Sequence, residues 1–341
     1  MSNKVIIANY LGLKVKYAQQ NLKPILDALH RLIEADRSRG MVSRVVDISN
    51  AAQMRTYNGR AVTSQKSELQ AKYAVDCIYA ATRADYLVLL DSWDVIPHLT
   101  LTNHIRHDDR TVPSDLPYAS DAPFTSRDPM RYAAATRVVG RIAGLTGAKE
   151  PSFLIGQIVA AAKYKSRRRA DYLAHLGLSA WQWRQSTAES VKAIFDSREI
   201  VACPDARSPT IQKRLGPMTH FINCHGQPGD PQFYGERGRG YPVAITSGDV
   251  AKAAKRNTIV AAECCYGAQL FDPGERGQWP IANTYLGAGA VAFLGSSNYA
   301  WGPPGAGNAS STCWAAHRPG EHFCRLGRNS SSDKEWRTPP T

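Results

Sequence analysis

The sequence has no uninterrupted apolar run of about eighteen residues, the length that a membrane-spanning helix requires. The first ten residues place only a short apolar centre among polar residues, unlike a signal peptide. These two absences predict that the protein makes no membrane contact and resides in the cytoplasm of its source cell.

Cysteine is scarce and irregularly spaced. The 341 residues include seven cysteines, and none of them form a Cys-x-x-Cys pair. An odd, irregular set argues against a disulfide framework and favours a reducing compartment in which a thiol stays free. The chain also lacks a Gly-x-Ser-x-Gly elbow and a Walker-type phosphate loop, so neither signature indicates a function. No cofactor is expected.

Acidic residues are outnumbered by basic ones. The chain contains 29 Asp and Glu against 42 Lys and Arg, for a net charge of +13. Such a charge attracts phosphate and acidic proteins. However, the arginines are scattered, and the densest basic group, residues 163–169, lies at the end of an expected helix. Nucleic acid is therefore not the favoured partner, whereas an acidic protein partner agrees with the charge.

Segments with the apolar patterns of strands and helices alternate along most of the chain, which is 43% hydrophobic. This alternation predicts an α/β fold with a mostly parallel central sheet and helices on both faces. A polar stretch at 100–131 contains four prolines and is expected to form an ordered excursion. The expected strands are residues 4–8, 44–48, 85–91, 137–142, 218–223, 258–263 and 290–295; the expected helices are 22–35, 67–81, 152–164 and 186–195.

Three parts follow from this pattern. Residues 1–145 are expected to form an amino-terminal α/β subdomain, and residues 146–308 a catalytic subdomain. Residues 309–341 are rich in Ser, Arg, Gly and Pro and show no clear period, so we expect a poorly ordered or atypical tail.

Two short segments carry the chemistry. Residues 218–226 read as a buried strand that ends in His225-Gly226, and residues 258–267 as one that ends in Cys264-Cys265 before a glycine. Between them, residues 245–257 have the polarity of a short helix. In a strand, helix, strand unit the strands run parallel and usually adjacent, so both reactive side chains should emerge at one carboxyl edge of the sheet.

An imidazole beside a thiol is the arrangement of a nucleophilic cysteine. The thiolate is the attacking form, and His225 can take its proton and later protonate a leaving amine. The backbone N–H of Gly226 is a candidate oxyanion donor. Alternatives remain open: each cysteine could be an ordinary buried residue, or Cys224, His225, Cys264 and Cys265 could hold zinc, although adjacent cysteines are poor chelators of one ion.

Further segments follow the same order as in a known group of enzymes. With the His-Gly and Cys-x-x-Gly strands, this order resembles the caspase, legumain and gingipain group of cysteine peptidases, the gingipain-type family above all. The matching segments are Tyr86–Leu90 leading to Asp94-Val95-Ile96-Pro97, Asp115-Leu116-Pro117-Tyr118, Val138-Val139-Gly140-Arg141, and Gly289–Ser297 with Trp301 close behind.

The resemblance implies a caspase-like three-layer sandwich and an endopeptidase that cleaves protein or peptide substrates through an acyl-enzyme. By its Cys-x-x-Gly spacing, Cys264 would be the nucleophile and Cys265 the alternative, with His225 as general base. Trp301, Glu150 and Asp115 would be candidate pocket residues. The acid that orients the histidine in some members falls here at Thr136 or Arg137, which predicts a dyad instead of a triad.

The family pattern ends after about Pro304, so the end of the chain is expected to be truncated or replaced relative to that family. An incomplete carboxyl end would suit a second interpretation: a catalytically silent caspase-like module that serves in interaction or signalling. The retained Cys and His residues favour the enzyme.

Overall fold

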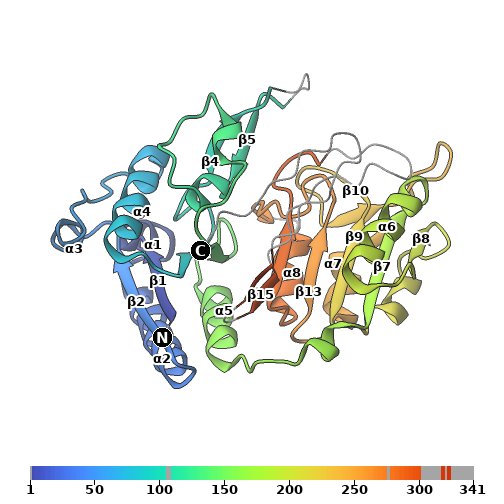
Figure 1. Ribbon diagram of the computed structural model, residues 1–341, viewed down its shortest axis with the longest axis horizontal. Helices are drawn as coiled ribbons and strands as arrows, with labels where there is room; N and C mark the ends of the chain where they lie inside the picture. Colours follow the sequence, from blue (N-terminus) through green and yellow to red (C-terminus); the bar gives the residue numbers. More distant parts are fainter. Residues whose placement is uncertain (1, 105–108, 275–276, 301–315, 319–320, 324–341) are drawn as a thin grey trace, which may run out of the picture.

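The structure is a computed structural model that describes residues 2–104, 109–274, 277–300, 316–318 and 321–323. Two separate parallel sheets dominate it (Figure 1). All strands of the first sheet lie within the predicted segment 1–145, and all strands of the second lie within 146–308. The division into two subdomains at residue 145 itself stays a prediction.

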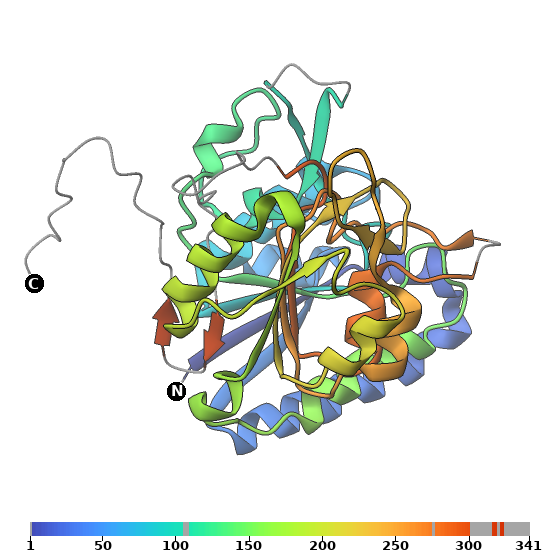
Figure 2. The same ribbon diagram turned by 90° about the vertical axis from the view of Figure 1, so that its right-hand side faces the viewer.

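The first sheet has the strand order β2-β1-β3-β6, with every neighbouring pair parallel. Helices α2 and α5 lie side by side, as Figure 2 shows along the lower edge of the molecule. The elements of this half are β1 (Ser2–Ala8), α1 (Tyr10–Tyr17), α2 (Leu22–Ser38), β2 (Met41–Asp47), α3 (Ala51–Thr56), α4 (Glu68–Thr82), β3 (Tyr86–Leu90), β6 (Val139–Ile142) and α5 (Ser152–Lys163).

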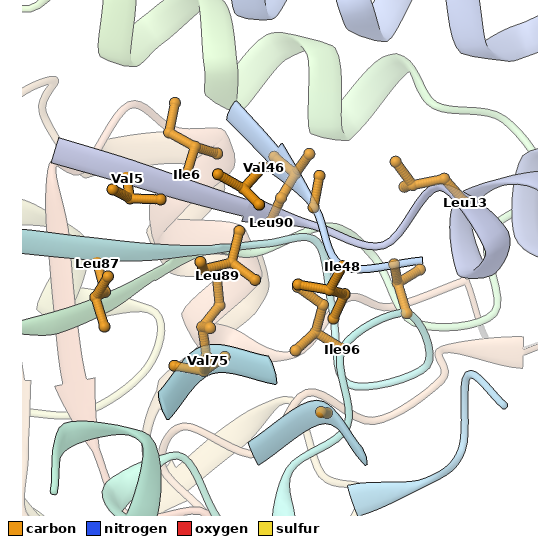
Figure 3. Packing of buried hydrophobic residues seen from close by; sticks show 14 of the residues in the cluster. Val5, Ile6, Leu13, Val46, Ile48, Val75, Leu87, Leu89, Leu90 and Ile96 are labelled. Carbon is orange, nitrogen blue, oxygen red and sulfur yellow. The ribbon is translucent and has the colours of Figure 1, made fainter. Parts of the chain in front are cut away.

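Apolar side chains on both faces of this sheet form its core. Leu89 of β3 points toward Val75 of α4, whereas Ile6 of β1 points to the opposite face (Figure 3). Helix α2 presents Ile25 and Leu29 to the core, both at most 1% exposed. Burying each such side chain contributes roughly 1.5–3 kcal/mol, which explains why the apolar spacing alone indicated the helix.

The second sheet has the order β14-β13-β9-β7-β8 and is also parallel throughout. Helices α7 and α8 pack against each other, while α6 packs on β7. Helix α7 begins with a capping box in which Thr246 and Asp249 bond each other's backbone N–H groups. The elements are β7 (His175–Ala180), α6 (Arg184–Phe195), β8 (Val201–Cys203), β9 (Thr219–Asn223), α7 (Ser247–Ala253), β13 (Ile259–Ala262), α8 (Ile281–Gly287) and β14 (Ala292–Gly295).

Three small antiparallel units complete the described chain. The predicted excursion at 100–131 contains the hairpin β4 (Leu99–Thr102) and β5 (Thr111–Ser114). A three-stranded sheet follows β9 and consists of β10 (His225–Gly226), β11 (Gln232–Tyr234) and β12 (Val243–Thr246). The hairpin β15 (Ala316–Arg318) and β16 (Glu321–Phe323) lies within the predicted tail.

Single-turn 3₁₀ helices connect these elements. They are η1 (Gln19–Asn21), η2 (Leu116–Ala119), η3 (Pro129–Tyr132), η4 (Arg169–Tyr172), η5 (Trp181–Trp183) and η6 (Thr210–Arg214).

The expected α/β class with parallel sheets is confirmed, but the strands form two sheets instead of one central sheet. Strand β7 was not predicted from the sequence, because its only distinctive feature is a glycine that lets the chain pack closely. A Cβ on Gly177 would lie 2.7 Å from the side chain of Ile200. Within the described residues, no helix is both long and apolar enough to cross a membrane.

The halves meet through hydrogen bonds from one to the other. Trp93 Nε1 donates to the carbonyl of Leu270 at 2.7 Å, and Asn283 Nδ2 donates to the carbonyl of Gly144 at 3.1 Å. These bonds hold the loops after β3 and β6 against the second half.

Candidate functional site

The strand order of the second sheet reverses direction between β7 and β9. From β7 the chain moves outward to β8, whereas from β9 it moves the other way through β13 to β14. In open parallel sheets, ligands bind at the carboxyl ends of the strands that flank such a reversal. Here Trp181 to Trp183 follow β7, and β9 is followed by β10, which begins at His225. Figure 1 shows β10 at one end of β9.

His225 is held by an acid and two aromatic rings. Its Nε2 lies 2.7 Å from Oε2 of Glu236, in the loop after β11. The ring centroid lies 4.3 Å from that of Trp183 and 5.2 Å from that of Tyr241. Among the described residues, Nδ1 of His225 has no hydrogen-bond partner. The contact with Glu236 therefore fixes the ring and leaves Nδ1 available for proton transfer.

The paired residues of β9 and β13 end three positions before the reactive residues. Ile222 of β9 stands opposite Ala262 of β13, and both strands continue in the same direction. Three residues further along are His225 on one chain and Cys265 on the other. Cys264 falls one residue earlier, level with Cys224, and both of these are at most 1% exposed.

Gly226 brings the two segments into contact. A Cβ placed on this glycine would lie 1.9 Å from the carbonyl oxygen of Cys265, a distance that no real side chain tolerates. Any residue other than glycine at position 226 would therefore require the backbone at Cys265 to move. Tyr266, directly after Cys265, adopts a left-handed φ of 55°, the kind of backbone strain that often accompanies functional sites.

The two adjacent thiols differ in environment. Cys264 is fully buried within the core of the second half, with Sγ 3.7 Å from the carbonyl oxygen of Ile222, and this burial raises the pKa of its thiol well above the ordinary value. Cys265 is only partly buried. Its Sγ lies 3.5 Å from both the carbonyl oxygen and the backbone nitrogen of Ala300, and partial burial raises its thiol pKa. Of these two cysteines, only Cys265 is partly exposed.

The segment that follows Cys265 is hydrogen-bonded to residues of the first half. Tyr266 donates a hydrogen bond from its hydroxyl to Asp109, in the loop between β4 and β5. Asn298 donates to the carbonyl oxygen of Thr111 at 2.9 Å, and accepts at its own carbonyl from the backbone of Tyr266. The predicted excursion therefore borders the cysteine-bearing loop.

Two of the three candidate pocket residues, Asp115 and Glu150, are described, and neither belongs to the group around His225. Asp115 makes a two-pronged ion pair with Arg141, at 2.6 and 2.8 Å. Arg141 and the nearby His98 hold the pKa of Asp115 below its ordinary value despite burial. Glu150 is exposed in the turn before α5. Neither residue makes a described contact with His225 or Cys265, and Trp301 lies outside the described residues.

Reasoning from the sequence missed Glu236. The expected position for an orienting acid, at Thr136 or Arg137, is occupied by residues of the first half, and Arg137 there pairs with Asp76. The available signal was the glycine-rich segment Gly235-Glu236-Arg237-Gly238, in which the acid stands eleven residues after His225. Its acid reaches the imidazole because β10 and β11 pair antiparallel, with His225 opposite Tyr234.

The zinc alternative has no geometric support. Among the described residues, no three or more His, Cys, Asp or Glu side chains are arranged to hold a metal ion. Cys224 and Cys264 point into the core, whereas His225 is engaged by Glu236.

Comparison with known proteins does not add a family to this geometry. No protein-family model matches the chain, and no curated protein matches it. The residues themselves therefore carry the functional argument.

Proposed function

We propose that this chain is a cysteine endopeptidase in which Cys265 is the nucleophile, His225 the general base and acid, and Glu236 the residue that orients the imidazole. The observation that carries the proposal is the equivalent position of His225 and Cys265 beyond two adjacent parallel strands, with Gly226 against the Cys265 carbonyl. The resemblance to gingipain-type peptidases, and with it a caspase-like sandwich, belongs to the same proposal.

The proposal prefers Cys265 to Cys264, in contrast to the spacing argument from the sequence. A nucleophile must reach a carbonyl carbon, and the Cys264 sulfur is fully buried behind its neighbour. It also replaces the expected dyad with a triad, because the carboxylate of Glu236 lies within hydrogen-bond distance of the imidazole.

The raised pKa of the Cys265 thiol favours proton transfer during attack over a thiolate formed beforehand. As the sulfur bonds to the peptide carbonyl carbon, Nδ1 of His225 takes the thiol proton. The same proton passes to the amine nitrogen as the C–N bond breaks. Water then attacks the thioester and gives a proton to Nδ1; as the C–S bond breaks and the acid leaves, Nδ1 returns this proton to the sulfur and the free thiol forms again. The N–H of Gly226 is the proposed donor to the oxyanion, where one such donor contributes about 3 kcal/mol.

Labelling with a peptidyl acyloxymethyl ketone tests this assignment, with the modified residue located by mass spectrometry. We expect modification at Cys265, and its rate should fall at least tenfold in His225→Ala. Cys264→Ala is the matched control and should still be labelled. If Cys265 reacts no faster than a free thiol such as glutathione, or is indifferent to His225, the peptidase proposal is wrong.

One observation favours a second candidate, the catalytically silent module. The Cys265 sulfur is engaged by the backbone of Ala300 and its thiol pKa is raised, as expected for a resting thiol. A chain that shows no turnover of any peptide pool and no labelling of Cys265, while remaining folded, would support this candidate.

A further inference from the structure

A second feature lies after β7, the other strand at the reversal of the second sheet. A cavity of about 520 Å³ lies between the first turns of α6 and strand β8. This volume is within the range of binding pockets for small molecules and side chains. Apolar and cationic residues share its lining: Trp181, Arg184, Gln185, Ala188, Ile200, Val201, Ala202, Asp205, Ala206 and Arg214.

Arginines surround Trp181 at the mouth of this cavity. The guanidinium carbon of Arg184 lies 4.5 Å from the Trp181 ring centroid, and that of Arg237 lies 4.2 Å from it. Arg184 also donates to the carbonyl oxygen of Trp181 at 2.9 Å, which fixes its position. Stacking on an aromatic face leaves the edge of a guanidinium free to bind a carboxylate.

The charges of the lining are not balanced. Its one acid, Asp205, is paired with Arg237 at 3.4 Å. Neither Arg184 nor Arg214 has a carboxylate partner among the described residues. A cavity lined by an aromatic ring and by two arginines that have no carboxylate partner among the described residues suits a carboxylate carried on a short apolar stem.

Two short stretches of chain connect the residues around this cavity with the proposed catalytic residues. Trp181 is two residues from Trp183, which contacts the His225 ring, and Arg237 directly follows Glu236. An extended peptide rises about 3.3 Å per residue, so a side chain a few positions from the scissile bond can reach from one to the other.

We infer that this cavity is a substrate subsite for an acidic side chain, glutamate or aspartate, of a bound peptide. The inference rests on the proposed peptidase function and adds a substrate class to it: peptides with an acidic residue a few positions from the cleaved bond. The net charge of +13 adds long-range attraction for the same substrates.

The test measures binding to the full chain carrying Cys265→Ala, so that it does not depend on hydrolysis. Capped ten-residue peptide pools carry Glu at one fixed position and neutral residues elsewhere, and matched pools carry Gln there. By calorimetry at low salt, we expect at least one Glu pool to bind about tenfold more tightly than its Gln partner. The double substitution Arg184→Gln and Arg214→Gln should remove that difference, whereas Lys213→Gln, an exposed neighbour outside the lining, should keep it.

Equal binding of every Glu and Gln pair, or a preference that survives the double substitution, would overturn the inference. N-acetylglutamate alone is a further arm: if it binds as tightly as the best peptide pool, the cavity is a site for free small anions and not a peptide subsite. A Glu preference without any turnover by the unmodified chain would leave the subsite standing and count against the peptidase.

Discussion

The two parallel sheets have the same kind of strand reversal, yet they use its carboxyl edge differently. In the first sheet the reversal lies between β1 and β3, and it is closed by helix α1. There Lys16 Nζ lies 2.9 Å from Asp91 and 2.8 Å from Asp94, with the lysine side chain only 4% exposed. In the second sheet, the edge carries His225 and Cys265, both partly accessible.

This difference shows what makes an edge a site. At the first edge Asp91 and Asp94 both pair with Lys16, and Asp94 also accepts from the backbone of Gly147 at 2.9 Å, which ties the edge to the chain that follows. Among the described residues, the buried Oδ2 of Asp91 has no hydrogen-bond partner. The second edge leaves Nδ1 of His225 without a partner among the described residues. The first edge is therefore expected to govern stability, and the second to govern activity.

The largest expected effect is a loss of activity without a loss of stability. Cys265→Ala should lower turnover of a cleaved peptide on the order of a thousandfold or more, because the nucleophile is lost. Its unfolding midpoint in urea should match that of the unmodified chain within error. Cys264→Ala is the control and should keep turnover per folded molecule within about tenfold. The opposite ranking of the two variants would return the nucleophile to Cys264.

The next largest expected effect is a loss of folding stability without a change in the reactivity of Cys265. Lys16→Met should destabilise the fold by about 3–5 kcal/mol, because it leaves Asp91 buried without its cation. Urea denaturation followed by circular dichroism measures this loss. The labelling rate of Cys265 in the remaining folded protein should be unchanged. A loss below about 1 kcal/mol would show that the pair contributes no more than an exposed one.

A fall in pH is expected to lower the stability of the second half through His220. His220 lies in β9 below the site, where its Nδ1 is 2.9 Å from the Tyr285 hydroxyl and its Nε2 3.0 Å from the Pro217 carbonyl. Since a carbonyl oxygen only accepts, Nε2 carries a hydrogen, and in the neutral ring Nδ1 accepts from the Tyr285 hydroxyl. Burial lowers its pKa from 6.5 to about 4.

A lowered folded-state pKa means that the unfolded chain takes up the proton first as the pH falls. The stability from neutral His220 is therefore present above pH 6.5 and lost between pH 6.5 and 4, about 3 kcal/mol in all. Asp91 has the opposite sign, because burial raises its pKa and the folded state holds its proton more tightly. Denaturation at several pH values measures the loss, and His220→Gln should flatten that part of the profile. An unchanged profile in this variant would contradict the assignment.

The smallest expected effect tests whether Glu236 assists His225 at the edge of the second sheet. Glu236→Gln keeps the size of the side chain but removes the charge that faces the imidazolium. A hydrogen bond to a charged group contributes about 1.5–3 kcal/mol, so kcat should fall about tenfold to a hundredfold with little change in KM. Glu236→Asp should recover less than the full rate. A Gln variant with unchanged kcat would reduce the triad to the predicted dyad.

Local patterns in the sequence determined a large part of the fold. The spacing of Ile25 and Leu29 indicated α2, and the apolar runs after Thr219 and Ile259 indicated two strands that are indeed parallel neighbours. The polar crossover between them was predicted as a helix, and α7 occupies Ser247–Ala253 within it. These features follow from periodicity and capping, which act over a few residues.

The sequence by itself therefore predicted that an imidazole and a thiol follow neighbouring strands at one edge of a parallel sheet, because a strand, helix, strand unit usually places its two strands side by side. Only the tertiary structure decided which of the two cysteines is exposed, since packing buries Cys264 in the core and leaves Cys265 partly exposed. The acid at Glu236 and the arginine-lined cavity also depend on segments that are distant in sequence. Such contacts are set by packing, and no local pattern encodes them.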